Sequence, residues 1–329
     1  MSATNKSQSG ESSAYRSYIL VLSSLTAMLA TAMPTMSIPV LFAEIAEDLG
    51  LTIVQIGTIW GAGSAAGIFT GLAAGTVTDK FGPKRTLVVS CLLIGITGSL
   101  RAFSSDFATL AGTVFLAGLL GPIIPVALHK SCGVWFTRRH LGVANGFVAA
   151  GMASGFMLGA MVSATLLSPL LGGWRQVMIF YGVVAVMMSV PWALSRAAPT
   201  GSENAAGAGN TAPMRQTLSH VIRLKNVWIL GLALLGIGGG IQGMLGYLPL
   251  YLREIGWPAA SADGALATFH AMSLISVFPI ALLSDRLGSR KRFLMIAALM
   301  VGAGIGSLAF VVGPLVWAAV MLAGVVRDG

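Results

Sequence analysis

The sequence predicts an all-α polytopic membrane protein with about nine or ten transmembrane helices in two unequal halves. Three observations support this fold class. Hydrophobic residues make up 55% of the 329 residues and charged residues only 9%, so polar side chains are too few to cover a soluble globule. Long apolar stretches recur along the chain, and basic residues gather in every second loop between them. A short charged motif occurs once in each half.

The first half begins with a polar, serine-rich segment, residues 1–17, which we expect to be a disordered cytoplasmic tail. Residues 18–195 are expected to form a complete bundle of six helices. Pro34 and Pro39 interrupt the first of these and favour a bent helix that faces a cavity. The six predicted helices cover residues 18–43, 52–78, 86–103, 110–135, 141–167 and 174–195.

The second half follows residues 196–226, which are rich in Gly, Ala, Ser and Asn and are expected to form a cytoplasmic linker. Residues 227–329 are expected to hold an incomplete second bundle. The chain ends at Gly329 within a tenth apolar segment, so we expect a truncated copy of a longer protein. Three helices are predicted at residues 227–252, 260–284 and 293–312. The tenth apolar segment is predicted to start near residue 314.

The distribution of basic residues predicts the orientation. Of the 20 Lys and Arg residues, about sixteen fall in segments on the side of the amino terminus. Lys and Arg are retained on the cytoplasmic side of membrane proteins. We therefore expect a multi-pass protein of a prokaryotic inner membrane with its amino terminus in the cytoplasm. The opposite loops hold few bases, namely Arg101, Arg175 and Arg253.

A motif of glycine, acid and bases marks the loop after the second predicted helix. Glycine recurs at every fourth residue of that helix from Gly63 to Gly75, which favours close packing of another helix. The acid, base and glycine return at the same offsets in the loop after the eighth predicted helix. The motif positions are Gly75, Asp79, Lys80, Gly82 and Arg85 in the first loop, and Asp285, Arg286, Gly288 and Arg290 in the second.

This pair of loops resembles the signature of the major facilitator superfamily of secondary transporters. The second copy departs from the pattern because Ala281 stands where the leading glycine is expected. The resemblance covers the whole apolar chain and implies two six-helix bundles, alternating access and a gating role for both loops. It also implies that Asp79 faces the start of an eleventh helix and Asp285 the start of the fifth. Helices 1, 4, 7 and 10 would line the substrate path.

Polar and ionisable groups inside apolar helices are the candidate substrate contacts, because each is costly in lipid. The implied path favours Gln242, Tyr247 and Arg327. Alternatives remain open for the others, since His129 and Lys130 can reach the inner surface and His270 can serve in helix packing or proton transfer. The full set of candidates is Gln242, Tyr247, Arg327, His129, Lys130 and His270.

These features predict a secondary active transporter for a small solute, driven by a gradient of an ion or counter-solute. No Asp or Glu lies in the middle of the first nine predicted spans, so the deep charges are positive and favour an organic or inorganic anion. Two alternatives remain: a drug or multidrug efflux transporter, for which the many methionines would form an adaptable cavity, and a fragment without transport activity.

An enzyme is not expected, because the sequence holds no metalloprotease HExxH, no phosphate-binding Walker A loop and no Gly-x-Ser-x-Gly elbow. Cys91 and Cys132 both fall in apolar helices, where buried apolar roles are favoured over a disulfide or a metal pair. We expect a monomer in the lipid bilayer with a small-molecule substrate, without a cofactor, a metal or a nucleic-acid partner.

Overall fold

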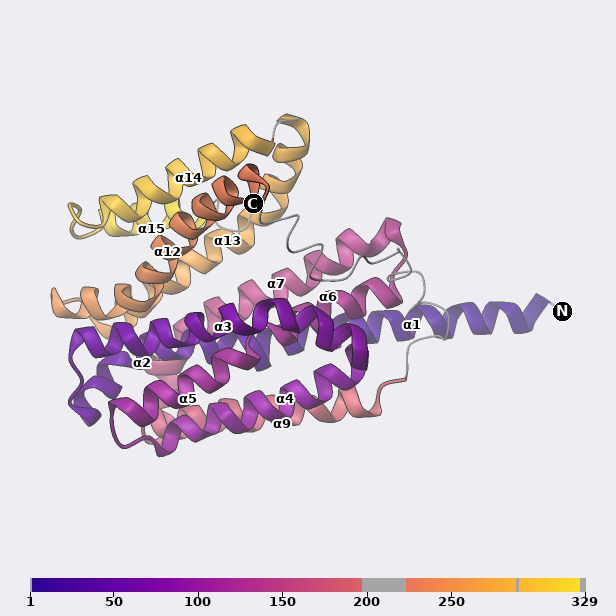
Figure 1. Cartoon of the computed structure of the whole chain (residues 1–329), viewed down its shortest axis with the longest axis horizontal. Helices are drawn as coiled ribbons and strands as arrows, with labels where there is room; N and C mark the ends of the chain where they lie inside the picture. Colours follow the sequence, from indigo (N-terminus) through magenta and orange to yellow (C-terminus); the bar gives the residue numbers. More distant parts are fainter. Residues whose placement is uncertain (1, 197–222, 288–289, 326–329) are drawn as a thin grey trace.

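The computed structural model describes residues 2–196, 223–287 and 290–325, and every regular element within them is a helix. Figure 1 shows two groups of helices, one from each half of the chain. The first group consists of α1 (Ser2–Thr26), η1 (Ala27–Ala32), α2 (Met33–Leu49), α3 (Ile53–Phe81), α4 (Pro83–Leu100), η2 (Arg101–Phe103), α5 (Phe107–Leu120), α6 (Ile123–Trp135), α7 (Arg138–Val162), η3 (Ser163–Leu167), α8 (Ser168–Leu171) and α9 (Trp174–Leu194). The second consists of α12 (Lys225–Glu254), α13 (Ala259–Leu287), α14 (Arg290–Ser307) and α15 (Leu315–Val325).

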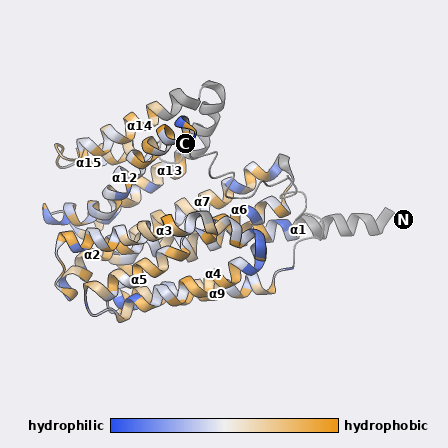
Figure 2. Cartoon of the chain, viewed as in Figure 1, coloured by the Kyte–Doolittle hydropathy of each residue, from blue (hydrophilic) through white to orange (hydrophobic). Residues whose placement is uncertain are grey.

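These helices confirm the polytopic membrane fold. Within the described residues, seven helices are long and apolar enough to cross a membrane, from Ala14–Leu49 to Val227–Glu254. Met295–Ser307 and Leu315–Val325 are shorter apolar helices. Figure 2 shows apolar residues along most of the length of these helices. Most of the predicted linker, residues 197–222, lies outside the described residues.

The structure continues the first span as a helix into the polar amino-terminal segment. Helix α1 begins at Ser2 and so includes residues 2–17, whose place as a disordered cytoplasmic tail stays a prediction. The costly step in helix formation is the first turn, and an apolar span that begins near residue 18 already supplies it. Each preceding residue can then extend the helix by one hydrogen bond.

Glycines mark the helix ends on both sides of α3. Gly50 has φ +62° and ends α2, and Gly82 has φ +76° and separates α3 from α4. Such backbone angles favour glycine because it lacks a Cβ atom. Pro83 then occupies the first position of α4, where no amide hydrogen bond is lost. The sequence therefore makes a tight, fixed turn at the first motif loop.

The first span has an irregular segment close to its prolines. Between α1 and α2 the chain passes through η1, a π-helical segment of six residues. Pro34 and Pro39 follow in α2, and neither can donate an amide hydrogen bond to the preceding turn. Short π-helical segments of this kind are frequent at functional sites.

Glycine stripes bring helices of the first group into close contact. A Cβ atom at Gly118 of α5 would lie 2.4 Å from the carbonyl oxygen of Gly63 in α3. Gly151, Gly155 and Gly159 of α7 approach the backbone of the first span in the same way, within 2.6–2.8 Å of such an atom. These glycines are therefore packing positions, because any side chain there would push the helices apart.

The two groups of helices meet at one end and separate toward the other. We call the end with the loops at 50–52, 104–106, 172–173 and 255–258 the outer end, and the opposite end, with Gly82, the inner end. The outer ends of α12 and α13 contact α2, α3 and α7, at the left of Figure 1. Residues 227–240 of α12 are exposed apart from half-buried Ile237, whereas burial begins at Ile241.

Candidate functional site

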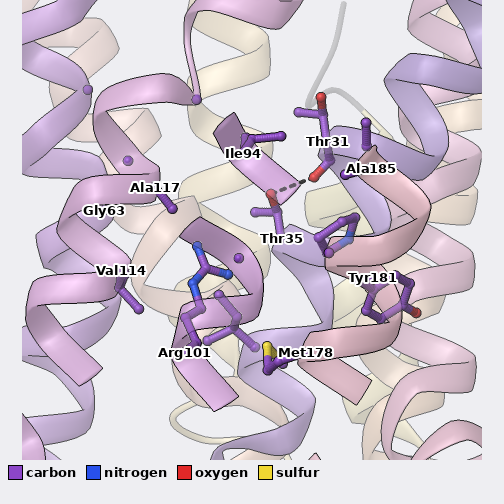
Figure 3. Close-up of a pocket in the computed structure, with 18 of the residues that line it drawn as sticks. Thr31, Thr35, Gly63, Ile94, Arg101, Val114, Ala117, Met178, Tyr181 and Ala185 are labelled. Carbon is purple, nitrogen blue, oxygen red and sulfur yellow. Dashed lines mark hydrogen bonds between the residues drawn. The ribbon is translucent and has the colours of Figure 1, made fainter. Parts of the chain in front are cut away.

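A cavity of about 310 Å³ lies among α2, α3, α4, α5 and α9, nearer the outer end of the first group. Figure 3 shows this cavity and the side chains around it. Most of its lining is apolar, with Ile38, Val114 and Met178 among the contributors. Its polar lining residues are Thr31, Thr35, Ser64, Arg101, Tyr181 and Gln242.

Arg101 is the cation of this cavity. It begins η2 at the end of α4, and its guanidinium group points into the cavity between Val114 and Thr35 (Figure 3). It forms no ion pair with any residue that the structure describes. Its Nε atom is buried and has no hydrogen-bond partner in the same part of the chain. A partly buried cation with an unpartnered nitrogen and no counter-charge is costly, so this position favours an anionic ligand.

Thr31, also in the lining, has a second polar atom without a partner in the part of the chain that the structure describes. Its Oγ1 atom is buried without a hydrogen-bond partner among the described residues. By contrast, the Thr35 hydroxyl donates to the carbonyl oxygen of Thr31 at 2.7 Å. The Tyr181 hydroxyl lies 2.8 Å from Ser163 Oγ. The cavity lining thus includes a guanidinium without a counter-ion and a hydroxyl without a hydrogen-bond partner among the described residues, beside polar groups that already have partners.

Gln242 and Tyr247, two of the predicted path residues, connect the two groups of helices. The Gln242 amide lies in the cavity lining and donates to Ser64 Oγ at 3.2 Å. Trp60 Nε1 donates to the Gln242 carbonyl oxygen at 2.8 Å. Tyr247 lies closer to the outer end, where its hydroxyl donates to the carbonyl oxygen of Ile53 at 3.3 Å. Gln242 therefore belongs to the cavity, and Tyr247 to the contact between α12 and α3.

The remaining path candidates lie elsewhere. The exposed His129 side chain contacts Asn145 Oδ1 at 3.2 Å. His270 is fully buried between the rings of Phe156 and Phe269, at centroid distances of 5.2 and 5.4 Å. Neither lines the cavity, and a place for them on the substrate path stays a prediction. Arg327 lies outside the described residues.

Lys130 forms an ion pair with Asp79, the acid of the first motif loop. The pair joins α6 to the end of α3, so Asp79 has a partner inside the first group. The Asp79 side chain is 71% exposed. Lys130, predicted as a path residue, does not line the cavity. The gating role of the motif loops stays a prediction.

The second motif loop is described only in part. Asp285, Arg286 and Arg290 lie in helical backbone, but their side chains are not among those that the structure describes, and Gly288 lies outside the described residues. The expected contact of Asp285 with the start of the fifth helix is therefore a prediction still.

Charged contacts gather at the outer end. Arg175 Nη2 lies 2.8 Å from Asp48 Oδ2 and joins the sixth span to the first. Ser168 Oγ donates to Glu44 Oε2 at 2.6 Å. Arg253 Nη2 lies 2.6 and 2.8 Å from the two carboxylate oxygens of Asp263, whose side chain is fully buried. These contacts tie the outer ends of the helices together.

Sequence reasoning assigned Arg101 to a loop and did not recognise it as a site residue. A usable signal was nevertheless present. An arginine at the outer end of a span runs against the positive-inside bias that the rest of the chain follows. Such an exception indicates that Arg101 has a role other than setting the orientation of the chain in the membrane.

Comparison with known proteins agrees with this architecture. The sequence model of the Major Facilitator Superfamily matches residues 20–328. The "Probable nitrate/nitrite antiporter NarK1" of Thermus thermophilus is 25% identical, with 77% of this chain aligned to 58% of that protein. The "Probable sulfoacetate transporter SauU" of Cupriavidus necator is 27% identical, with 81% aligned to 65%. The chain thus spans about three fifths of the length of these two relatives.

Two solved structures have a similar fold. A mutant form of the nucleoside transporter NupG superposes with a TM-score of 0.76 at 12% identity, covering 94% of this chain and 79% of that one. A bacterial homolog of the human lysosomal transporter Spinster, in an inward-facing and unoccupied conformation, gives 0.73 at 15% identity, covering 95% and 73%.

Proposed function

Because this chain belongs to the Major Facilitator Superfamily, we propose that it serves as a secondary transporter for a small organic anion. The proposed mechanism is alternating access, in which the two groups of helices rock about a central binding site. The names of its relatives favour this class of activity. Nitrate, nitrite and sulfoacetate, which two of them are named for, are all anions.

The observation that carries the anion proposal is the guanidinium of Arg101 in the cavity. A carboxylate or sulfonate bound there would accept charge-assisted hydrogen bonds from Arg101 and a further one from the Thr31 hydroxyl. The apolar side chains of Ile38, Val114 and Met178 would contact the uncharged body of the substrate. A volume of about 310 Å³ is at the small end of ligand cavities, which favours a compact solute.

The contact between the groups supports a state that is open at the inner end. The hydrogen bonds from Trp60 and Tyr247 join α3 to α12 toward the outer end. The inner half of α12, in contrast, is exposed. In the predicted orientation this state would admit substrate from the cytoplasm.

A drug efflux transporter is the competing proposal, supported by the largely apolar cavity lining. Many such substrates are organic cations, which the positive charge of Arg101 would repel. The two proposals therefore differ in the sign of the ligand charge.

Binding to the purified chain in detergent distinguishes them. Isothermal titration calorimetry with sulfoacetate, galactonate and 4-hydroxybenzoate tests the anion class, and tetraphenylphosphonium tests the cation class. We expect at least one anion to bind and Arg101→Gln to weaken it by about 10- to 100-fold, since a hydrogen bond to a charged group contributes about 1.5–3 kcal/mol. Arg223→Gln, in an exposed turn before α12, is the matched control. Unchanged anion binding in Arg101→Gln, or binding of the cation alone, would contradict the proposal.

A further inference from the structure

A second cavity lies at the inner end of the first group. We call it the loop pocket; its volume is about 370 Å³. It is lined by residues 79–85 together with Ser131, Trp135, Trp192, Ser195 and Arg196. Three elements therefore build it: the first motif loop and the inner ends of α6 and α9. The gating role expected of the motif loop gives no reason for a cavity at this place.

The loop pocket has an excess of positive charge. Among the residues that the structure describes, it is lined by the bases Lys80, Lys84, Arg85 and Arg196 and by one acid, Asp79. That carboxylate is already paired with Lys130, which lies outside the lining. In the described ranges none of the four lining bases forms an ion pair. An anion entering the pocket would therefore meet four bases that have no counter-ion in the described part of the chain.

Two of these bases are held in place by neighbouring elements. Lys84 Nζ donates to the carbonyl oxygen of Ser195 at the end of α9. The guanidinium of Arg196 lies over the ring of Tyr15, 5.2 Å from its centroid. The same ring packs against Trp135 at a centroid distance of 5.1 Å. A fixed side chain loses less entropy when it binds a ligand, so the pocket is partly preorganised.

Apolar surface adjoins these charges. Phe81, in the lining, is 52% exposed, and Leu194, next to the lining residue Ser195, is 80% exposed. Val89 on α4 is also 52% exposed. In a membrane helix such residues face lipid. Tryptophan, here Trp135, is typical of the level of the lipid headgroups. The loop pocket therefore lies where a charged headgroup and the start of its acyl chains would meet.

We propose that the loop pocket binds a phosphate-bearing anion and that the bilayer supplies it as the headgroup of an anionic phospholipid. The phosphodiester would accept hydrogen bonds from Lys84 and Arg196, and the acyl chains would run past Phe81 and Leu194. A soluble phosphate ester shares the headgroup chemistry but would leave the adjoining apolar surface without a partner. This proposal does not depend on the transported substrate.

Native mass spectrometry of the delipidated full chain tests the proposal. The chain is titrated with phosphatidylglycerol and, separately, with phosphatidylcholine of the same acyl composition. We expect tighter binding of phosphatidylglycerol, and a loss of about fivefold for each base removed in Lys84→Gln and Arg196→Gln. Lys225→Gln, at the start of α12 and outside the pocket, should leave binding unchanged. Arg85→Gln keeps the bond from Lys84 to Ser195 and therefore tests the charge without disturbing that contact.

Three results would overturn the proposal. Equal affinity for the two lipids would show that the pocket does not prefer an anionic headgroup. An equal loss in Lys225→Gln would show a diffuse surface effect rather than a pocket. A thermal shift with glycerol 3-phosphate that is lost in Lys84→Gln and Arg196→Gln, without a preference for phosphatidylglycerol, would assign the pocket to a soluble phosphate ester.

Discussion

At the scale of single residues, the ion pair between Asp79 and Lys130 explains how the first motif loop keeps its acid. A carboxylate near the carboxyl end of α3 is disfavoured by the helix dipole. The ammonium group of Lys130 compensates for this from the neighbouring α6. Because Asp79 is largely exposed, the pair should contribute only about 0–1 kcal/mol to stability. The ion pair therefore contributes little to the stability of the fold.

We predict that Asp79→Asn slows transport while leaving membrane insertion and thermal stability nearly unchanged. Transport should slow because the loop is expected to have a gating role. Stability should change little because the exposed ion pair contributes little to it. Initial rates of uptake into proteoliposomes and unfolding curves in detergent would measure the two effects. Asp106→Asn, the same change at the outer end, is the control. Uptake at the rate of the unmodified protein would refute the gating role.

Asp106 predicts a specific pH dependence of stability. Its carboxylate accepts a hydrogen bond from the backbone N–H of Thr109 at 2.9 Å, which lowers the pKa of Asp106 below 3.8. The charged cap therefore stabilises α5 at pH values above the ordinary pKa. That stability is lost as the pH falls through the lowered pKa. Asp106→Asn keeps a capping oxygen but cannot titrate.

We therefore expect the unfolding temperature to fall more steeply from pH 5 to pH 3 in the unmodified protein than in Asp106→Asn. Differential scanning fluorimetry in detergent at each pH would measure the difference between the two proteins, which removes the contribution of the other carboxylates. Parallel curves would show that the Asp106 cap does not contribute.

At the scale of elements, the contact between α3 and α5 depends on Gly63 and Gly118. We predict that Gly118→Ala destabilises the protein by about 1–3 kcal/mol, because the added Cβ atom would overlap the Gly63 backbone. Gly112→Ala in the same helix is the control, since no atom lies within 4 Å of a Cβ at that position. It should be neutral or stabilising by up to about 1 kcal/mol. Thermal unfolding of both variants would measure this, and equal effects would refute the close contact.

Periodicity and turn chemistry were enough to predict the helices. The Gly82-Pro83 turn, for example, follows from two residues whose backbone preferences leave few alternatives. The contact partners of side chains were harder to predict. Lys130 and Asp79 are 51 residues apart, and they pair only because α6 packs beside α3. The role of Arg101 likewise depends on the direction in which the last turn of its helix points, which local sequence does not determine.

At the scale of the whole molecule, the two groups of helices contact each other through their outer ends. One apolar core crosses between them and includes Phe42 of α2, Ile59 of α3, Leu245 of α12 and Phe269 of α13. The repeated loop motif predicted two halves. The motif did not predict which ends of the two groups are in contact. A protein that alternates between two states has the same sequence in both, so the sequence does not select one of them.

We predict that a crosslink between the outer ends stops transport. In the double variant Gly57→Cys and Tyr247→Cys, the two positions face each other, since a Cβ at Gly57 would overlap the Tyr247 hydroxyl. A short, cleavable bifunctional thiol reagent should abolish uptake, and reduction should restore it. Each single variant treated alike is the control, and the native Cys91 and Cys132 are buried. Normal uptake by the crosslinked protein would contradict alternating access at this contact.

The π-helical segment η1 has a consequence for the rotational phase of the first span. Each residue of an α-helix turns the helix by about 100°, so one residue more or fewer in residues 27–32 would rotate α2 against α1 by that angle. The α1 face that packs on Gly151 would keep its place. Thr35 would instead turn from the cavity, and Asp48 would turn from Arg175. The irregular turn thus lets one continuous helix present its inner half to a packing face and its outer half to the cavity and the outer charges.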